Sequence, residues 1–330
     1  MKFGIGVICP HAESKPAVEN FQTVIEQVVT AKKADFNFVW SGHHVVMSKN
    51  HRFQPVPSIA RIAADSGDMH LGYNMIMALR HPVEIAEQIA TLDAITDGKI
   101  ILGPIAGYHD EEFQAYGVPK SQRGERLVEG VEIIKRLWTE DEVTYDGRHY
   151  SIENVTINPK PVQKPWPPIW IGANKDEMVK RASELGDTWF IPPHDTRDTI
   201  ERQLSLTKDP SGTGYGGVQP KIAETFVAES DEEAIATYKP YIEEYYEWYK
   251  QAGQHEAMEK PSAIDLNATG LERFLIGSPE TVTEKIKELE DLGIDCLCFR
   301  MQQPGIPNDE LLKSIRLIGK NVIPEIRENR

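Results

Sequence analysis

Short apolar segments alternate with amphipathic segments along most of this chain, and no other feature constrains its fold as strongly. The apolar segments are rich in β-branched and aromatic residues, as buried strands are, and the segments between them repeat apolar residues at helical spacing. Strands are predicted, in chain order, over residues 2–9, 35–40, 69–77, 99–105, 167–173, 187–191, 221–230 and 294–301. Eight strand–helix repeats favour an α/β fold whose parallel sheet closes into a (β/α)8 TIM barrel.

An open, doubly wound sheet could be built from the same elements. Such sheets commonly carry a glycine-rich turn directly after the first strand, whereas the GIGVIC sequence at residues 4–9 lies inside the predicted strand. Because 40% of the 330 residues are hydrophobic, the chain can form one large core. We therefore expect residues 1–330 to form a single TIM-barrel domain.

Three stretches fall outside the alternation and are predicted to be insertions, chiefly after strands 4 and 7. Residues 139–166 contain a hairpin turn at Asp146-Gly147, residues 208–217 are rich in glycine, and residues 251–277 precede the last predicted strand. Long loops in a compact barrel are commonly functional, so each stretch is a candidate lid. The alternative for each is a surface loop without catalytic duty.

The chain has 51 acidic and 36 basic residues, which give a net charge of −15. This charge would repel nucleic acid and anionic membranes, so neither is expected as a partner. No apolar run approaches the roughly 20 residues of a membrane span and the first residues do not resemble a signal peptide, so we expect a cytoplasmic protein. Cys9, Cys296 and Cys298 are expected to be reduced and structural.

The sequence WSGHH places His43 and His44 directly after the second predicted strand. In a barrel the active site lies at the carboxyl ends of the strands. A metal site is disfavoured, because adjacent side chains leaving a strand diverge and no further ligand follows at suitable spacing. One imidazole is expected to face the barrel mouth as an acid, base or hydrogen-bond donor, and the other to face away.

The sequence IGANK, after the fifth predicted strand, suggests a phosphate site. Gly172 and Ala173 allow a ligand to approach the backbone, and Asn174 is a good helix N-cap. Lys175 would be disfavoured in a first helical turn unless an anion lay there. The alternative is an ordinary helix start with a solvated lysine.

The sequence contains no nucleophile elbow, Walker loop, dinucleotide fingerprint or HExxH motif. The acid pair Glu111-Glu112 is interpreted as a helix opening, where the helix dipole stabilises carboxylates. The aromatic residues from Tyr241 to Tyr249 predict a helix, interrupted at Pro240, that packs on the core or on a second subunit.

Four long segments, at residues 80–118, 123–138, 167–189 and 275–300, carry a family resemblance. They read RHPVEIAEQIATLDAITDGKIILGPIAGYHDEEFQAYGV, RGERLVEGVEIIKRLW, PPIWIGANKDEMVKRASELGDTW and LIGSPETVTEKIKELEDLGIDCLCFR. In these motifs and in their order the chain resembles the bacterial-luciferase-like superfamily of flavin-dependent monooxygenases. The resemblance implies a TIM barrel with insertions and a flavin across its carboxyl-end mouth.

The resemblance also implies roles for particular residues. His43 would face the flavin ring and the substrate, and Arg300 would bind an anionic or carbonyl substrate group, its alternative being a salt bridge to a nearby acid. A non-proline cis peptide behind the ring would fall near Tyr73-Asn74, and Gly42 stands where the family commonly has Glu. The residues implied to contact the cofactor are Asn74, Ala106, Tyr108, Gly172, Ala173, Asn174, Lys175 and Trp189.

The function implied is a two-component monooxygenase. A separate flavin reductase would supply FMNH2, which with O2 would form a C4a-peroxyflavin that oxygenates a small organic substrate. One alternative is an oxidoreductase that uses the deazaflavin F420 to transfer hydride without O2. Another is a non-catalytic flavin-binding subunit. A homodimer is expected.

Overall fold

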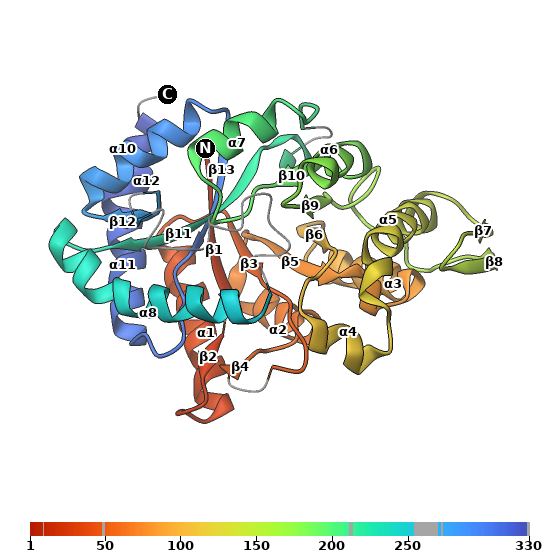
Figure 1. The fold of residues 1–330 in the computed structure, drawn as a ribbon, viewed down its shortest axis with the longest axis horizontal. Helices are drawn as coiled ribbons and strands as arrows, with labels where there is room; N and C mark the ends of the chain where they lie inside the picture. The colour runs from red at the N-terminus through yellow and green to blue at the C-terminus, as the bar shows by residue number, and fades with distance from the viewer. Residues whose placement is uncertain (9, 48–49, 211–213, 254–269, 272, 329–330) are drawn as a thin grey trace.

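The structure is a computed structural model that describes residues 1–330 except 9, 48–49, 211–213, 254–269, 272 and 329–330. It contains the predicted alternation of strands and helices, with the helices arranged around a central sheet (Figure 1). The strands are β1 (Lys2–Ile8), β2 (His11–Ala12), β3 (Phe38–Ser41), β4 (Asn50–His51), β5 (His70–Ile76), β6 (Ile100–Ile105), β7 (Val143–Asp146), β8 (Ser151–Val155), β9 (Trp170–Gly172), β10 (Thr188–Phe190), β11 (Pro220–Val227), β12 (Leu275–Gly277) and β13 (Cys296–Arg300).

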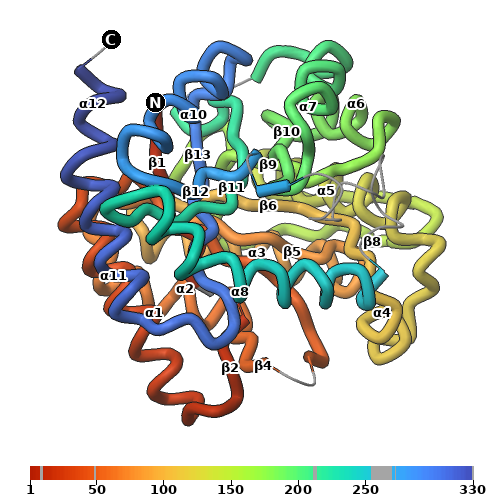
Figure 2. The backbone as a smooth tube through the Cα atoms, turned by 60° about the vertical axis from the view of Figure 1, so that its left-hand side comes forward, coloured from red at the N-terminus to blue at the C-terminus, as the bar shows by residue number. Residues whose placement is uncertain are grey.

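The helices cover the outer face of the sheet, and α8 crosses in front of it in Figures 1 and 2. They are α1 (Ala17–Lys33), α2 (Pro55–Ser66), α3 (Pro82–Ile95), α4 (Asp110–Tyr116), α5 (Arg123–Thr139), α6 (Asp176–Leu185), α7 (Arg197–Leu204), α8 (Asp231–Gln251), α10 (Pro279–Glu290), α11 (Asn308–Leu317) and α12 (Ile323–Glu328). The prediction that Pro240 interrupts the aromatic helix is wrong, because α8 runs through it. None of the described helices is long and apolar enough to cross a bilayer.

The central sheet is parallel and curled. Its strand order is β10-β9-β6-β5-β3-β1-β13-β11-β12. Two strands that are far apart in this order, β10 and β11, also meet. Ile191, directly after β10, forms a parallel bridge to Lys221 of β11, and the Ile191 N–H donates to the carbonyl of Pro220 at 3.0 Å. The α/β fold with a curled parallel sheet is thus as predicted from the alternation.

Aromatic side chains fill the concave side of the curled sheet. Phe38 of β3 lies edge-on to Trp170 of β9, with ring centroids 5.6 Å apart, although two strands separate β3 from β9. Trp40 stacks on Trp170 at 5.2 Å. Two neighbouring glycines make room for these rings: a Cβ at Gly72 would lie 2.2 Å from the Trp40 ring, and one at Gly103 would lie 2.5 Å from it. We call Phe38, Trp40, Trp170 and Phe190 the aromatic plug.

The glycine-rich stretch 208–217 was a candidate lid, and the structure places its described part at the opposite end of the strands. The Tyr215 hydroxyl donates to the carbonyl of Asn37, just before β3, and its ring lies 4.1 Å from that of His70 at the start of β5. The reason is connectivity, since a segment leading into β11 must lie at the amino end of the sheet.

The hairpin predicted at Asp146-Gly147 is present as β7 and β8, but it does not cover the carboxyl end either. Glu129 of α5 accepts hydrogen bonds from three successive backbone N–H groups, those of Arg148, His149 and Tyr150. These bonds attach the hairpin to α5. The third candidate lid, 251–277, lies largely outside the described residues; its end forms β12, which pairs with β11.

Candidate active site

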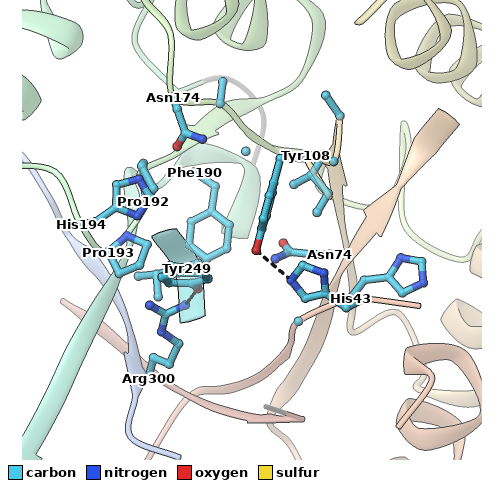
Figure 3. Close-up of a pocket in the computed structure, with 18 of the residues that line it drawn as sticks. His43, Asn74, Tyr108, Asn174, Phe190, Pro192, Pro193, His194, Tyr249 and Arg300 are labelled. Atoms are coloured by element: carbon cyan, nitrogen blue, oxygen red, sulfur yellow. Dashed lines mark hydrogen bonds between the residues drawn. The ribbon is translucent and has the colours of Figure 1, made fainter. Parts of the chain in front are cut away.

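A cavity of about 240 Å³ lies at the carboxyl ends of the parallel strands (Figure 3). Every predicted site residue except Trp189 lines it: His43, Asn74, Ala106, Tyr108, Gly172, Ala173, Asn174, Lys175 and Arg300. Trp189 is buried elsewhere, and its Nε1–H donates to the carbonyl of Ala173 at 2.9 Å. The next residue, Phe190, reaches the cavity instead, because successive strand residues point to opposite faces.

The aromatic plug forms the inner end of the cavity, where Trp40 and Phe190 are lining residues. Trp40 Nε1–H donates to Asn74 Oδ1 at 3.2 Å, which occupies the acceptor end of that amide. Asn74 therefore offers its NH2 group to a ligand. The cis peptide expected near Tyr73-Asn74 is absent, since the two cis bonds among the described residues precede Pro159 and Pro165.

His43 is held in one orientation and one tautomer. Its side chain is 2% exposed, and Nδ1 accepts the backbone N–H of Ile76, the last residue of β5, at 3.0 Å. Since Nδ1 is an acceptor, the ring proton lies on Nε2. Burial, helped by the neighbouring His44, lowers the pKa of His43 to about 4, so the ring is neutral at pH 7 and Nε2–H is a donor.

His44 was expected to face away, but it lines the same cavity. Its Nδ1 lies 2.9 Å from Oε1 of Glu112, which also accepts the N–H of Val45 at 2.9 Å. Burial alone would raise the pKa of Glu112, but the hydrogen bond from His44 and the N–H of Val45 hold that pKa below its usual value. Glu112 is fully buried and is therefore a partner of His44, a role that the helix-opening interpretation missed.

The two adjacent histidines thus carry their protons on different nitrogens. The ionised Glu112 can only accept, so His44 is protonated on Nδ1, and its Nε2 accepts the Tyr108 hydroxyl at 3.3 Å. Burial raises the pKa of Tyr108 well above its usual value, so the phenol stays protonated. These hydrogen bonds can pass a proton from the cavity through Tyr108 to His44, and Glu112 would stabilise the resulting imidazolium. We call His43, His44, Tyr108 and Glu112 the histidine wall.

A second carboxylate supports the facing side of the cavity. Glu224 of β11 is fully buried, pairs with Arg300 of β13 and accepts Gln303 Nε2 at 3.2 Å. Arg300 also donates to the hydroxyl of Tyr249. Figure 3 shows Arg300 and Tyr249 across the cavity from Tyr108 and Asn74. We call Glu224, Tyr249 and Arg300 the arginine wall. The salt bridge expected as the alternative for Arg300 is present, and Arg300 also lines the cavity; its binding of a substrate group stays a prediction.

The segment after β9 brings backbone and polar groups to the cavity together. Gly172, Ala173, Asn174 and Lys175 all line it. The predicted N-cap is shifted by one residue, since Lys175 occupies that position and no side chain caps α6. Asn174 is fixed by its carbonyl, which accepts Gln203 Nε2 at 2.8 Å.

Several cavity residues were not found from the sequence. Tyr245 and Tyr249 come from α8, whose aromatic residues were expected to pack on the core or on another subunit. Arg52 lies in no motif singled out from the sequence, and Arg123 opens the segment 123–138 without a role assigned to it. His194 is 2% exposed, and neither of its ring nitrogens has a hydrogen-bond partner among the described residues. Its segment, WFIPPH, follows a predicted strand as WSGHH does and was therefore expected near the site, but His194 itself was given no role.

Comparison with known proteins gives independent information on the fold and on the family. Two relatives are an FMNH2-dependent dimethylsulfone monooxygenase from Pseudomonas putida, 25% identical over 75% of this chain and 71% of the relative, and an F420-dependent hydroxymycolic acid dehydrogenase from Mycobacterium tuberculosis, 23% identical over 98% and 88%. The crystal structure of monooxygenase RslO1 from Streptomyces bottropensis superposes with a TM-score of 0.88 at 22% identity, covering 99% of this chain and all of that one.

The family model described as luciferase-like monooxygenase matches residues 1–296. This match spans most of the chain and includes both walls of the cavity except Arg300. The chain therefore belongs to the luciferase-like monooxygenase family.

Proposed function

We propose that this protein is the oxygenase of a two-component monooxygenase that uses FMNH2 and O2 to oxygenate a small organic substrate. The observation that carries the proposal is that the buried, neutral His43 lines the same cavity as the backbone segment Gly172–Lys175. His43 is suited to the reacting end of a flavin, and the segment Gly172–Lys175 is suited to its phosphate.

The chemistry of the cavity suits FMN. The NH2 group of Asn74 can donate to a carbonyl or ring nitrogen of the flavin, and Trp40 and Phe190 offer apolar contact to a ring. Lys175 and the backbone N–H groups at the start of α6, which no side chain caps, suit a phosphate. When bound, reduced FMN would supply the electrons that activate O2.

The protein's own residues would then control protons and water. His43 would donate a hydrogen bond from Nε2 to the oxygen being transferred or to the substrate. The chain Tyr108–His44–Glu112 would accept a proton released in the reaction. Arg300, held by Glu224, would orient a polar substrate group. Burial of these groups keeps bulk water from the reacting atoms.

FMN is preferred to F420 because the cavity rim beside Lys175 is not strongly basic. The next two residues of α6 are Asp176 and Glu177, which pair with Arg202 and Arg181. An acidic cofactor tail would meet these carboxylates. The relative that uses F420 keeps hydride transfer without O2 as the second candidate.

Anaerobic binding of FMNH2 and of reduced F420 to the purified protein tests the choice of cofactor, and mixing the FMNH2 complex with O2 tests the chemistry. We expect FMNH2 to bind the more tightly and its re-oxidation by O2 to be slower in the complex than free in solution. Tighter binding of F420, or re-oxidation at the free rate, would reject the proposal. A protein that bound flavin without altering its reactivity would instead be a flavin-binding subunit.

The proposal also includes a fully closed (β/α)8 barrel with insertions, a separate flavin reductase, a homodimeric assembly and a cytoplasmic location. The bridge between Ile191 and Lys221 supports closure of the barrel. Light scattering on the purified protein measures the assembly state, and NADH-dependent turnover with and without an added flavin reductase tests the need for that partner.

A further inference from the structure

The charged residues that line the cavity are all cationic. They are Arg52, Arg123, Lys175 and Arg300, and no carboxylate belongs to the lining among the described residues. This contrasts with the chain as a whole, which carries 51 acidic and 36 basic residues. A cavity of one sign inside a protein of the other sign concentrates ligands of opposite charge, here anions. A flavin phosphate accounts for only part of this charge.

Arg52 is a cation of the cavity lining whose charge no described carboxylate compensates by an ion pair. Arg300 has Glu224, whereas Arg52 forms no ion pair with any described residue. Its Nη2 donates to the Tyr245 hydroxyl at 3.0 Å, its guanidinium lies 5.6 Å from the ring centroid of Trp248, and its buried Nε has no acceptor within the described part of the chain. A guanidinium that is partly buried without an anion beside it is unfavourable, so a ligand anion would complete its contacts.

The position of Arg52 relates it to the reacting groups. Its positive charge contributes to the lowered pKa of His44 and acts on Tyr108, so it lies near the histidine wall. Tyr245 connects it to the other side, because the Arg300 guanidinium lies 5.4 Å from the Tyr245 ring. An anion on Arg52 would therefore lie between the two walls, apart from the segment Gly172–Lys175 suited to the flavin phosphate.

From these contacts we infer that the substrate is a small organic anion and that Arg52 binds its carboxylate or sulfonate group. The fork of N–H donors on a guanidinium matches two oxygens of such a group. That the bound anion is a substrate rests on the proposed function, but the binding of the anion can be measured without turnover.

The test compares probes of the same shape and different charge on FMN-saturated protein. Benzoate and benzenesulfonate are the anions, and benzamide and benzenesulfonamide are their neutral counterparts. Titration calorimetry is expected to show the anions binding about 10- to 100-fold more tightly than the amides. In Arg52→Gln this preference should fall to about two-fold or less, while the affinity for FMN is unchanged.

Arg61→Gln is the matched control, because Arg61 is exposed on α2 and pairs with Asp65. It should keep the full anion preference. If Arg52→Gln fails to fold, Arg52→Met, which retains the stem contact with Trp248, is judged by the same criteria.

Three results would overturn the inference: no anion preference in the unmodified protein, a preference that survives removal of Arg52, or a loss of FMN affinity as large as the loss of anion affinity. The last result would assign Arg52 to the cofactor. Failure of the proposed function looks different, since it shows in the comparison of FMNH2 with F420 and in the rate of re-oxidation by O2, whereas the anion preference is measured without turnover.

Discussion

The two walls of the cavity are built alike but differ in what their charges can do. In each wall a fully buried glutamate pairs with a side chain that lines the cavity: Glu112 pairs with His44, and Glu224 pairs with Arg300. The histidine wall is titratable and holds its protons on defined nitrogens. The arginine wall is a permanent ion pair, because a guanidinium keeps its proton at any physiological pH. One wall is suited to moving protons and the other to holding a substrate in place.

Replacing His43 with Ala tests the histidine wall most directly. If Nε2–H acts on the reacting oxygen, turnover should fall by about 10²- to 10⁴-fold, while the dissociation constant for FMNH2 changes little. Steady-state rates and anaerobic flavin binding measure the two effects. His70→Gln is the control, since His70 lies at the start of β5, at the other end of the strands. Equal losses in both variants would remove His43 from the chemistry.

Replacing Glu224 with Gln tests whether the arginine wall is a structural ion pair. The amide keeps the shape but leaves Arg300 without a compensating charge, so the free energy of unfolding should fall by about 3–5 kcal/mol. Urea unfolding measures it. Glu229→Gln, at an exposed position shortly after β11, should change it by less than about 0.5 kcal/mol. A similar, small effect of both substitutions would contradict a buried pair.

The histidine wall should also make stability depend on pH. The pKa of His43 is about 4 in the fold and 6.5 otherwise, so the unfolded chain binds more protons between these values. Stability from this residue is complete above pH 6.5 and is lost as the pH falls towards 4, on the order of 3 kcal/mol in all. Urea midpoints at several pH values measure the slope. His43→Gln should make the slope shallower, and an unchanged slope would exclude the residue.

Replacing Glu112 with Gln converts the titratable wall into a neutral one. The amide oxygen can still accept the N–H of Val45, so the loss of stability should be about 1–3 kcal/mol. The imidazolium of His44 loses its stabilising anion, which lowers the pKa of His44 further, so the acid limb of the pH–rate profile should move to lower pH. The adjacent Glu111 is exposed, and Glu111→Gln should leave both the profile and the stability unchanged.

Tyr108→Phe makes the smallest change, the loss of one hydroxyl. Its hydrogen bond to His44 Nε2 is worth about 1 kcal/mol, and turnover should fall by about five- to ten-fold if Tyr108 relays a proton. Stopped-flow rates with FMNH2 measure this effect. Tyr116→Phe, at an exposed position on α4, is the control. An unchanged rate in Tyr108→Phe would confine the tyrosine to a packing role.

Sequence reasoning found those parts of the site that depend on strand ends. His43, Gly172 and Arg300 lie at or directly after the ends of predicted strands, and a parallel sheet brings such positions together whatever the details of the helices. This is why the fold and one side of each wall could be predicted. Asn74 lies inside its strand and was expected from the family resemblance.

The remaining site residues depend on contacts between distant elements. Glu112 lies 68 residues from His44, and nothing in its own helix distinguishes it from Glu111. Tyr249 reaches the cavity only because α8 crosses the mouth. The cofactor contact was expected at Trp189, whereas Phe190 lines the cavity, because a one-residue difference in a strand reverses the face to which a side chain points.

The aromatic plug determines how substrates could diversify in this protein. Trp40 occupies space left by Gly72 and Gly103 on the neighbouring strands, so truncating it would open a void that no adjacent side chain could fill. Deepening the cavity is therefore costly in evolution and in engineering. Tyr245 and Tyr249 line the cavity from α8, which lies outside the central sheet, so a change of either side chain leaves the aromatic plug intact. We therefore expect specificity in this protein to vary first at α8.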